Sequence, residues 1–212
     1  MSSPIRVGLI GLGRGTGTMK PGLWAAQAHL PYLLASPNFR VAAVCNSTVE
    51  SAQASITYHK LGADVKAFGN PEDLASDADV DLIVVSVGVA QHYKLTKPAI
   101  LAGKDVFVEW PLGKTTAEAE ELTKLAKEKG VKTIVGLQAR ASPIVVKIKE
   151  IVDSGKLGKF VSSTVVATFS FPVDIWPQGA EYYLDINSGG NSLLIYFAHC
   201  KPPPPPTRSK PR

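Results

Sequence analysis

Residues 5–17 of the 212-residue chain read IRVGLIGLGRGTG, and this stretch decides the fold. Its first six residues form a short apolar run with β-branched side chains, which is typical of a buried strand. Alternate glycines follow at once, from Gly11 to Gly17. A glycine-rich turn directly after a first strand lets backbone N–H groups approach a pyrophosphate. The stretch therefore predicts a dinucleotide-binding loop rather than an ordinary glycine-rich loop, although strict G-x-G-x-x-G spacing would need glycine where Thr16 stands.

Strand-like apolar runs alternate with helix-like segments outward from this stretch. Strands are expected at 39–45, 82–86, 105–109 and 131–137, and helices at 24–35, 48–61, 91–102, 115–129 and 142–154, with a further helix start at Asn70-Pro71. This alternation predicts an α/β fold whose parallel sheet has helices on both faces, a doubly wound Rossmann domain.

The alternation of strand-like and helix-like segments ends after residue 154. A β-branched run at 160–169 predicts a strand that opens a second, strand-rich unit. We therefore expect a Rossmann domain over residues 1–140 and the start of an incomplete α+β domain over 141–200. A proline-rich tail at 201–212 is expected to be disordered; a docking peptide and the product of a misread gene are the alternatives.

The net charge of +5 does not predict a nucleic-acid-binding face. Residues 201–212 hold four basic residues and no acid, which leaves 19 basic and 18 acidic residues in 1–200. The body is nearly neutral, so the basic character belongs to the tail. We expect no direct contact with nucleic acid.

Composition also excludes several other classes. No apolar run approaches the roughly 18 residues that a membrane helix needs, and no secretory h-region precedes the first glycines. Cys45 and Cys200 lie far apart and predict neither a disulfide framework nor a metal site. We expect a cytoplasmic or nuclear protein without a metal or a membrane anchor.

The residues at the end of the second predicted strand do not decide between NAD and NADP as the cofactor. An acid usually holds the adenosine ribose there, but this chain has Asn46 followed by Ser47 and Thr48. Asparagine can bond a hydroxyl and does not repel a 2′-phosphate, and no arginine follows closely. Both NAD and NADP remain candidates.

Four stretches of the chain resemble the glucose–fructose oxidoreductase/inositol dehydrogenase (Gfo/Idh/MocA) family. They are VGLIGLG at 7–13, VVS with QHY at 84–93, VFVEWPL at 106–112 and GGN through the histidine at 189–199. The resemblance implies a Rossmann domain that binds NAD or NADP. It also implies an open-sheet α+β domain that binds sugars or polyols and often forms dimers, normally longer than what remains here.

Two polar groups that the resemblance implies at the hydride-transfer centre are replaced. Trp110 stands where the family's proton-transferring lysine is usual, and Ile195 stands where an aspartate is usual, while His199 is kept. Indole does not titrate and donates one hydrogen bond. Losing an acid/base partner costs roughly 10²–10⁴-fold in rate.

One branch of the family, the fungal repressors of galactose genes, shares these departures. The matching stretches are WAA at 24–26 with His29, VVSV at 84–87, VEW at 108–110 and LQAR with SP at 137–143. The resemblance to this branch implies a fold kept for binding a dinucleotide and a transcriptional activator rather than for turnover.

Individual residues near the expected site allow more than one interpretation. Glu109 is either a ligand contact at a strand end or a solvated acid, and the resemblance favours the contact. Trp110 either packs beside Pro111 or stacks near a nicotinamide. His92 is equally a capping residue or a ribose contact, whereas His29 fits a packed or solvated residue better. The residues predicted to bind the cofactor are Gly11, Gly13, Arg14, Asn46, Ser86, Val87, His92, Glu109, Trp110 and Gln138.

The chain is thus expected to be an NAD(P)-binding regulator of the galactose-repressor type with little or no catalysis. The alternative is an NAD(P)-dependent oxidoreductase that acts on a sugar or polyol hydroxyl, and a third is a fragment without function. The expected partners are a transcriptional activator protein, a sugar ligand and, if the second domain were complete, a second copy of the chain.

Overall fold

The computed structural model describes residues 3–15, 22–159, 161–162, 164, 166 and 181–200. Six of the ten residues of the strand expected at 160–169 and the whole tail at 201–212 lie outside the described residues. The four described residues of that stretch, 161, 162, 164 and 166, are not in a strand. Among the described residues, no helix is long and apolar enough to cross a membrane.

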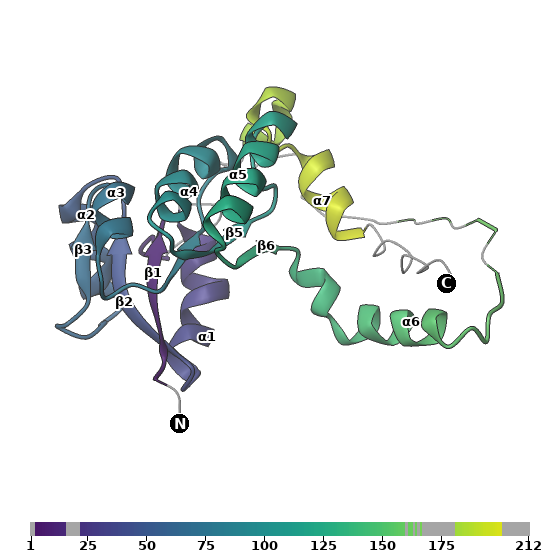
Figure 1. Cartoon of the computed structure of the whole chain (residues 1–212), viewed down its shortest axis with the longest axis horizontal. Coiled ribbons are helices and arrows are strands. Elements are labelled where there is room, and N and C mark those ends of the chain that lie inside the picture. Colours follow the sequence, from purple (N-terminus) through teal and green to yellow (C-terminus); the bar gives the residue numbers. More distant parts are fainter. Residues whose placement is uncertain are drawn as a thin grey trace.

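Six parallel strands form one sheet in the order β3-β2-β1-β4-β5-β6 (Figure 1). The chain starts in the middle of the sheet, builds outward to β3, and returns through β4 to the other side, which is the doubly wound arrangement. The predicted fold class is therefore confirmed. The strands are β1 (Ile5–Ile10), β2 (Phe39–Cys45), β3 (Lys66–Phe68), β4 (Leu82–Val85), β5 (Asp105–Glu109) and β6 (Thr133–Gly136).

Helices cover both faces of the sheet and enclose two apolar cores. On one face, α3 (Pro71–Ser76), α4 (His92–Leu101) and α5 (Thr116–Lys129) pack on Ile83, Val85, Val106 and Val108. On the other face, α1 (Leu30–Ala35) and α2 (Val49–Tyr58) pack on Val7, Leu9, Val41 and Val44. Residues from β1 enter both cores because successive side chains of a strand point to opposite faces.

Polar caps begin the helices where the sequence indicates them. Asn70 accepts a hydrogen bond from the Asp73 N–H, and Pro71 occupies the first helical position. The same cap forms at Thr48, Thr115 and Ser142, the last of which opens α6 (Pro143–Asp153). The remaining elements are η1 (Ala25–His29), η2 (Val89–Gln91), η3 (Gln138–Ala141), η4 (Glu181–Leu184), η5 (Ile186–Ser188) and α7 (Ser192–Cys200).

Two local features differ from the sequence prediction. The short strand β3, Lys66–Phe68, has no counterpart among the expected strands, because three residues are too few to show a pattern. The expected single helix at 24–35 contains a π-helical turn, η1, over Ala25–His29 before it continues as α1. Such turns are rare inside α-helices and are frequent at functional sites.

Helix α6 lies away from the sheet and has no buried residue (Figure 1). Its apolar side chains recur at helical spacing, and Ile144 and Ile148 are 73% and 55% exposed. Ile151 and Val152 on the same stripe are also exposed, as is Ile134 on the edge strand β6. The stripe formed by Ile144, Ile148, Ile151 and Val152 is called the α6 stripe below.

A charged cluster ties β1 to β4 at the amino edge of the sheet. Asp81 accepts hydrogen bonds from the Arg6 N–H at 2.8 Å, from its Nε at 2.9 Å and from its Nη2 at 2.7 Å. These bonds lower the pKa of Asp81 from 3.8 to about 2. A carboxylate with a depressed folded-state pKa stabilises the fold above its ordinary pKa, and this stabilisation is lost as the pH falls toward about 2.

We therefore expect the melting temperature of the wild type to fall more steeply between pH 4 and pH 2 than that of Asp81→Asn. Circular dichroism melts at half-unit pH steps measure the difference. Asp153→Asn makes the same chemical change on α6, far along the chain from Arg6, and should follow the wild type. Parallel pH profiles for the wild type and Asp81→Asn would contradict a stabilising role for the Arg6–Asp81 bonds.

Candidate dinucleotide-binding site

Gly11 stands where the carboxyl ends of β1, β2 and β4 meet. Its N–H donates to the Cys45 carbonyl at 3.0 Å, and its φ is +92°, in the left-handed region that favours glycine. A Cβ at this position would lie 2.4 Å from the Ser86 carbonyl oxygen and 2.5 Å from Val87 Cγ1. Glycine is therefore required here, because the backbone that follows β4 passes too close to leave room for a side chain.

Side chains from β2 and α2 hold the carbonyls of the glycine loop. Asn46 Nδ2 donates to the Leu12 carbonyl at 3.0 Å, and Ser55 Oγ donates to the same oxygen at 2.7 Å. His59 Nε2 lies 2.7 Å from the Gly13 carbonyl. With its carbonyls fixed toward α2, the loop is held in one conformation before any ligand binds.

Gly22 closes the glycine loop from the far side. The Gly13 N–H donates to the Gly22 carbonyl at 3.2 Å, and a Cβ on Gly22 would lie 2.1 Å from the Gly13 nitrogen. This contact holds the glycine loop against the residue that precedes the helix at 24–35. Residues 16–21, between the two, lie outside the described residues. The irregular spacing seen in the sequence therefore corresponds to a longer loop that still closes on itself.

Ser86 provides a buried polar group without a partner at the same edge. The residue is 4% exposed, and its Oγ has no hydrogen-bond partner in the described part of the chain. An unpaired buried hydroxyl costs about 1–3 kcal/mol, so native proteins rarely keep one without a use. Its position beside Gly11 fits a site for polar groups of a dinucleotide, which would supply the missing partner.

The carboxyl end of β5 carries an acid–histidine pair. His29 Nε2 lies 2.5 Å from Glu109 Oε1, and the two side chains are 17% and 14% exposed. The His29 ring also meets Phe107 edge-on, with centroids 5.2 Å apart. Gly136 permits this arrangement, since a Cβ there would lie 2.8 Å from Glu109 Oε2.

Sequence reasoning expected Glu109 at the site but favoured a packed or solvated role for His29. The two residues are 80 positions apart in the chain, so no spacing rule connects them. The π-helical turn that ends at His29 is the local signal, and it is visible in the backbone rather than in the sequence.

Trp110 joins the Rossmann sheet to the later part of the chain. Its indole Nε1 donates to the Leu194 carbonyl in α7 at 2.8 Å. Helix α7 also places Ile195 beside Gly190, where a Cβ would lie 3.7 Å from Ile195 Cδ1. Burial lowers the pKa of His199 on the same helix, and the charge of Glu109 acts in the opposite direction. Trp110 thus contacts α7, the helix that carries Ile195 and His199.

His92 connects the loops that follow β4 and β5. It is buried, and its Nδ1 lies 2.7 Å from the Pro111 carbonyl while its Nε2 lies 3.0 Å from the Val87 carbonyl. Burial lowers its pKa, so the ring is neutral at pH 7 and donates from one nitrogen at a time. The structure places His92 behind the strand edge, where it orients the segments that carry Val87 and Trp110.

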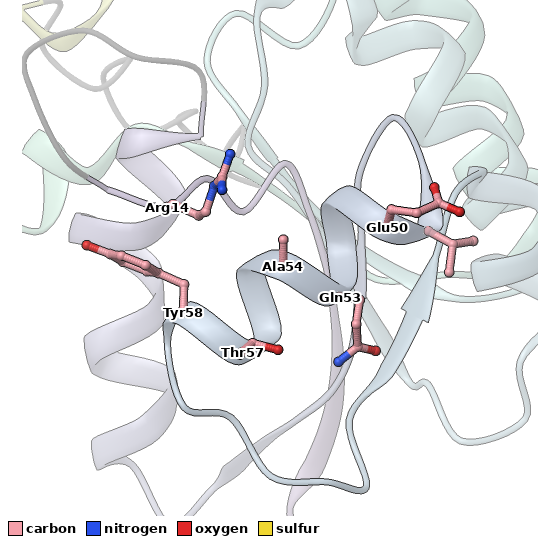
Figure 2. Close-up of a pocket in the computed structure, with 7 residues that line it drawn as sticks. Arg14, Glu50, Gln53, Ala54, Thr57 and Tyr58 are labelled. Atoms are coloured by element: carbon pink, nitrogen blue, oxygen red, sulfur yellow. The ribbon is translucent and has the colours of Figure 1, made fainter.

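Arg14 lines a groove of about 700 Å³ along the outer side of α2 (Figure 2). Figure 2 places Arg14 at the Tyr58 end of the helix and Glu50 at the other end. Gln138 begins η3 just beyond β6 and is exposed. The remaining lining residues of the groove are Val49, Gln53, Ala54 and Thr57.

The structure thus gathers most of the predicted site residues at one edge of the sheet. In the described ranges, no group of three or more histidines, cysteines, aspartates or glutamates is placed to hold a metal ion. The residues at the carboxyl edge are Gly11, Gly13, Asn46, Ser86, Val87, Glu109 and Trp110, with His92 behind them.

Comparison with known families identifies the two parts of the chain. The model of the oxidoreductase family with the NAD-binding Rossmann fold (GFO_IDH_MocA) matches residues 5–137. The model of the Gal80p C-terminal domain matches residues 143–201.

Individual relatives include both an enzyme and a regulator. Dehydrogenase aclE of Aspergillus oryzae is 39% identical over 202 residues, which cover 94% of this chain and 53% of that protein. The galactose/lactose metabolism regulatory protein GAL80 of Saccharomyces cerevisiae is 31% identical over 210 residues, covering 93% and 46%. The chain spans about half the length of the curated relatives it matches.

Solved structures agree with the sequence comparison. The crystal structure of the super-repressor mutant Gal80(S0)-[G301R] of Gal80p from Saccharomyces cerevisiae matches with a TM-score of 0.76 and 31% identity, covering 93% of this chain and 50% of that one. Gal80p from Kluyveromyces lactis matches with a TM-score of 0.75 and 29% identity, covering 93% and 48%. The resemblance read from the sequence is confirmed. Because the family model matches more than half of its residues, the chain belongs to the Gfo/Idh/MocA oxidoreductase family with the NAD-binding Rossmann fold.

Proposed function

We propose that this protein is a dinucleotide-binding regulator that uses NAD or NADP as a ligand with little or no turnover. The carrying observation is the bond from the Trp110 indole to the Leu194 carbonyl. The only N–H of the side chain at the usual lysine position is thereby occupied within the protein. With Ile195 in place of the usual aspartate, two of the expected polar groups are unavailable to a substrate hydroxyl.

The same proposal includes the organisation and partners of the chain. Residues 1–140 form the dinucleotide-binding unit and residues 141–200 begin a second unit, whereas the tail at 201–212 lies outside the described residues. The binding partner is a transcriptional activator protein, in keeping with the regulatory relatives, and the protein acts in the cytoplasm or nucleus. A sugar ligand and a second copy of the chain are further proposed partners.

The second candidate function is an oxidoreductase that moves hydride between NAD(P) and a sugar or polyol hydroxyl. The His29–Glu109 pair favours it, because a histidine oriented by a carboxylate is a common proton acceptor in enzymes. The 39% identical relative is named a dehydrogenase. A bound nicotinamide would accept or donate the hydride, while His29 and Glu109 would hold the proton.

A melt and a turnover assay separate the two functions. Saturating ligand at about 100 times its dissociation constant adds about 2.7 kcal/mol to the unfolding free energy. We expect NAD or NADP to raise the melting temperature by several degrees. We expect no change in absorbance at the reduced nicotinamide band with a panel of sugars and polyols.

Two variants test whether the residue at position 110 is what prevents turnover. Trp110→Phe keeps an aromatic ring but loses the bond to Leu194, and Trp110→Lys restores the family's usual acid/base group. Both should still bind dinucleotide, and only Trp110→Lys should gain turnover. Steady turnover by the wild type that Glu109→Gln abolishes would replace the regulator with the oxidoreductase.

A further inference from the structure

Two side chains near the end of α2 hold neighbouring carbonyls of the glycine loop. Ser55 Oγ donates to the Leu12 carbonyl at 2.7 Å, and His59 Nε2 lies 2.7 Å from the Gly13 carbonyl. Ser55 and His59 are four positions apart, which places their side chains on the same side of the helix. A carbonyl oxygen only accepts hydrogen bonds, so Nε2 of His59 carries a proton and donates it to Gly13.

His59 is held in place rather than free to swing away from the loop. It is the C-cap of α2, and its own N–H donates to the Ser55 carbonyl at 3.0 Å. Its half-buried ring meets the Tyr58 ring edge-on, with centroids 4.9 Å apart. The ring also lies close to Gly15, since a Cβ there would be 3.8 Å from His59 Cε1. The imidazole therefore reaches the glycine loop from a fixed position.

The bond from His59 sets the direction of the peptide group between Gly13 and Arg14. This peptide is trans, and in a trans peptide the N–H points opposite to the carbonyl. With the Gly13 carbonyl held toward α2, the Arg14 N–H must point away from α2. The preceding peptide follows the same rule. Its carbonyl, on Leu12, faces α2, and its N–H, on Gly13, donates on the other side to the Gly22 carbonyl at 3.2 Å.

The Arg14 N–H differs from the Gly13 N–H in its partner. Within the described part of the chain, no hydrogen bond uses the Arg14 N–H. Arg14 is exposed, so a ligand can approach it. A backbone N–H that faces outward from a glycine loop is a donor for a pyrophosphate oxygen. Such a bond to a charged oxygen is roughly twice as strong as one between neutral groups, and its strength depends on its direction.

We propose that His59 is a positioning residue of the dinucleotide site, which holds the Gly13 carbonyl against α2 and thereby directs the Arg14 N–H toward the pyrophosphate. His59 does not touch the ligand and acts through the backbone of the loop. The proposal rests on the proposed function, since the site must first bind a dinucleotide. It adds to that function a residue that lies outside the glycine loop.

Isothermal titration of the 212-residue protein tests this role, with whichever of NAD and NADP the wild type binds more tightly. His59→Phe keeps a ring in the same space and removes the donor. We expect it to weaken binding by about tenfold or more, because the bond to a charged group is lost or misdirected. His59→Gln keeps a side-chain N–H at a similar reach and should stay within about threefold of the wild type. Melts confirm that both variants are folded.

The Arg14 amide provides a readout that a change in packing alone would not produce. In protein labelled with ¹⁵N-arginine, saturating dinucleotide should shift the Arg14 amide proton downfield in the wild type and in His59→Gln, because the N–H then donates to phosphate. In His59→Phe saturated with the same ligand, this shift should be absent. Arg40, which pairs with Asp64 at the start of β2, is the internal reference and should not move.

Other results would overturn the proposal. Unchanged binding by His59→Phe, or equal weakening by both variants, would overturn the positioning role and leave dinucleotide binding intact. An Arg14 amide that does not respond to bound dinucleotide in the wild type would overturn the direction assigned to its N–H. A wild type that binds neither NAD nor NADP would overturn the proposed function and the positioning role together.

Discussion

Replacing Gly11 with alanine should weaken dinucleotide binding by at least 100-fold and lower the free energy of unfolding by about 3 kcal/mol. A left-handed residue with a side chain costs about 1–2 kcal/mol from backbone strain alone. At Gly11 the new methyl group would also lie 2.4 Å from the Ser86 carbonyl oxygen, which belongs to the backbone and has no free rotation. The glycine loop and the segment after β4 must then separate, which displaces the loop that we expect to bind the dinucleotide.

Gly103 provides the matched control for Gly11. It has a similar positive φ of +76°, but no heavy atom lies within 4 Å of its Cβ position. Gly103→Ala should therefore show only the backbone strain and should bind dinucleotide like the wild type. Denaturant unfolding and isothermal titration on both variants make the comparison. Equal losses of stability, together with unchanged binding by Gly11→Ala, would mean that the strand ends do not enclose the ligand.

Replacing His92 with alanine should lower the free energy of unfolding by about 3–4 kcal/mol. The substitution removes a ring that is 1% exposed and leaves a cavity. It also leaves one of the Pro111 and Val87 carbonyls without the N–H that the neutral ring donates. An unpaired buried acceptor adds about 1–3 kcal/mol to the cost of the cavity.

His92→Phe separates these two causes, because it keeps an aromatic ring in the space and removes both ring nitrogens. We expect it to recover part of the lost stability but not the positions of the two loops. Since those loops carry Val87 and Trp110, dinucleotide binding should weaken in both variants. A His92→Phe protein with the stability and affinity of the wild type would show that the ring acts through packing alone.

Three of the strands could be predicted from the sequence to the residue. Ile5–Ile10, Phe39–Cys45 and Asp105–Glu109 are apolar runs bounded by glycine or polar residues, so periodicity and composition agree. Edge strand Lys66–Phe68 could not be predicted, because three residues with a lysine show neither alternation nor a buried run. The predicted helix at 142–154 agrees with Pro143–Asp153, because the sequence itself contains the residues that begin and end the helix, a Ser-Pro cap and a following glycine.

The chemistry of the site was predictable by position but not by orientation. The sequence indicates that Asn46 follows one predicted strand and that Glu109 ends another, so both lie at the carboxyl edge of the sheet. It does not indicate that Ser51 and Ser55 accept hydrogen bonds from the Asn46 amide nitrogen. Nor does it indicate that His29, 80 positions from Glu109 in the sequence, contacts that residue. These contacts depend on helix placement, which follows from the packing of whole faces rather than from any short motif.

The α6 stripe has a consequence for how the protein must be handled. Four large aliphatic side chains on one helix face, with Ile134 exposed on the edge strand β6, form an apolar surface that stays in water. Each such side chain gains about 1.5–3 kcal/mol when another apolar surface covers it. Association through this surface increases with protein concentration, and hydrophobic attraction weakens on cooling, so dilution and low temperature are the conditions that keep solutions of this chain clear.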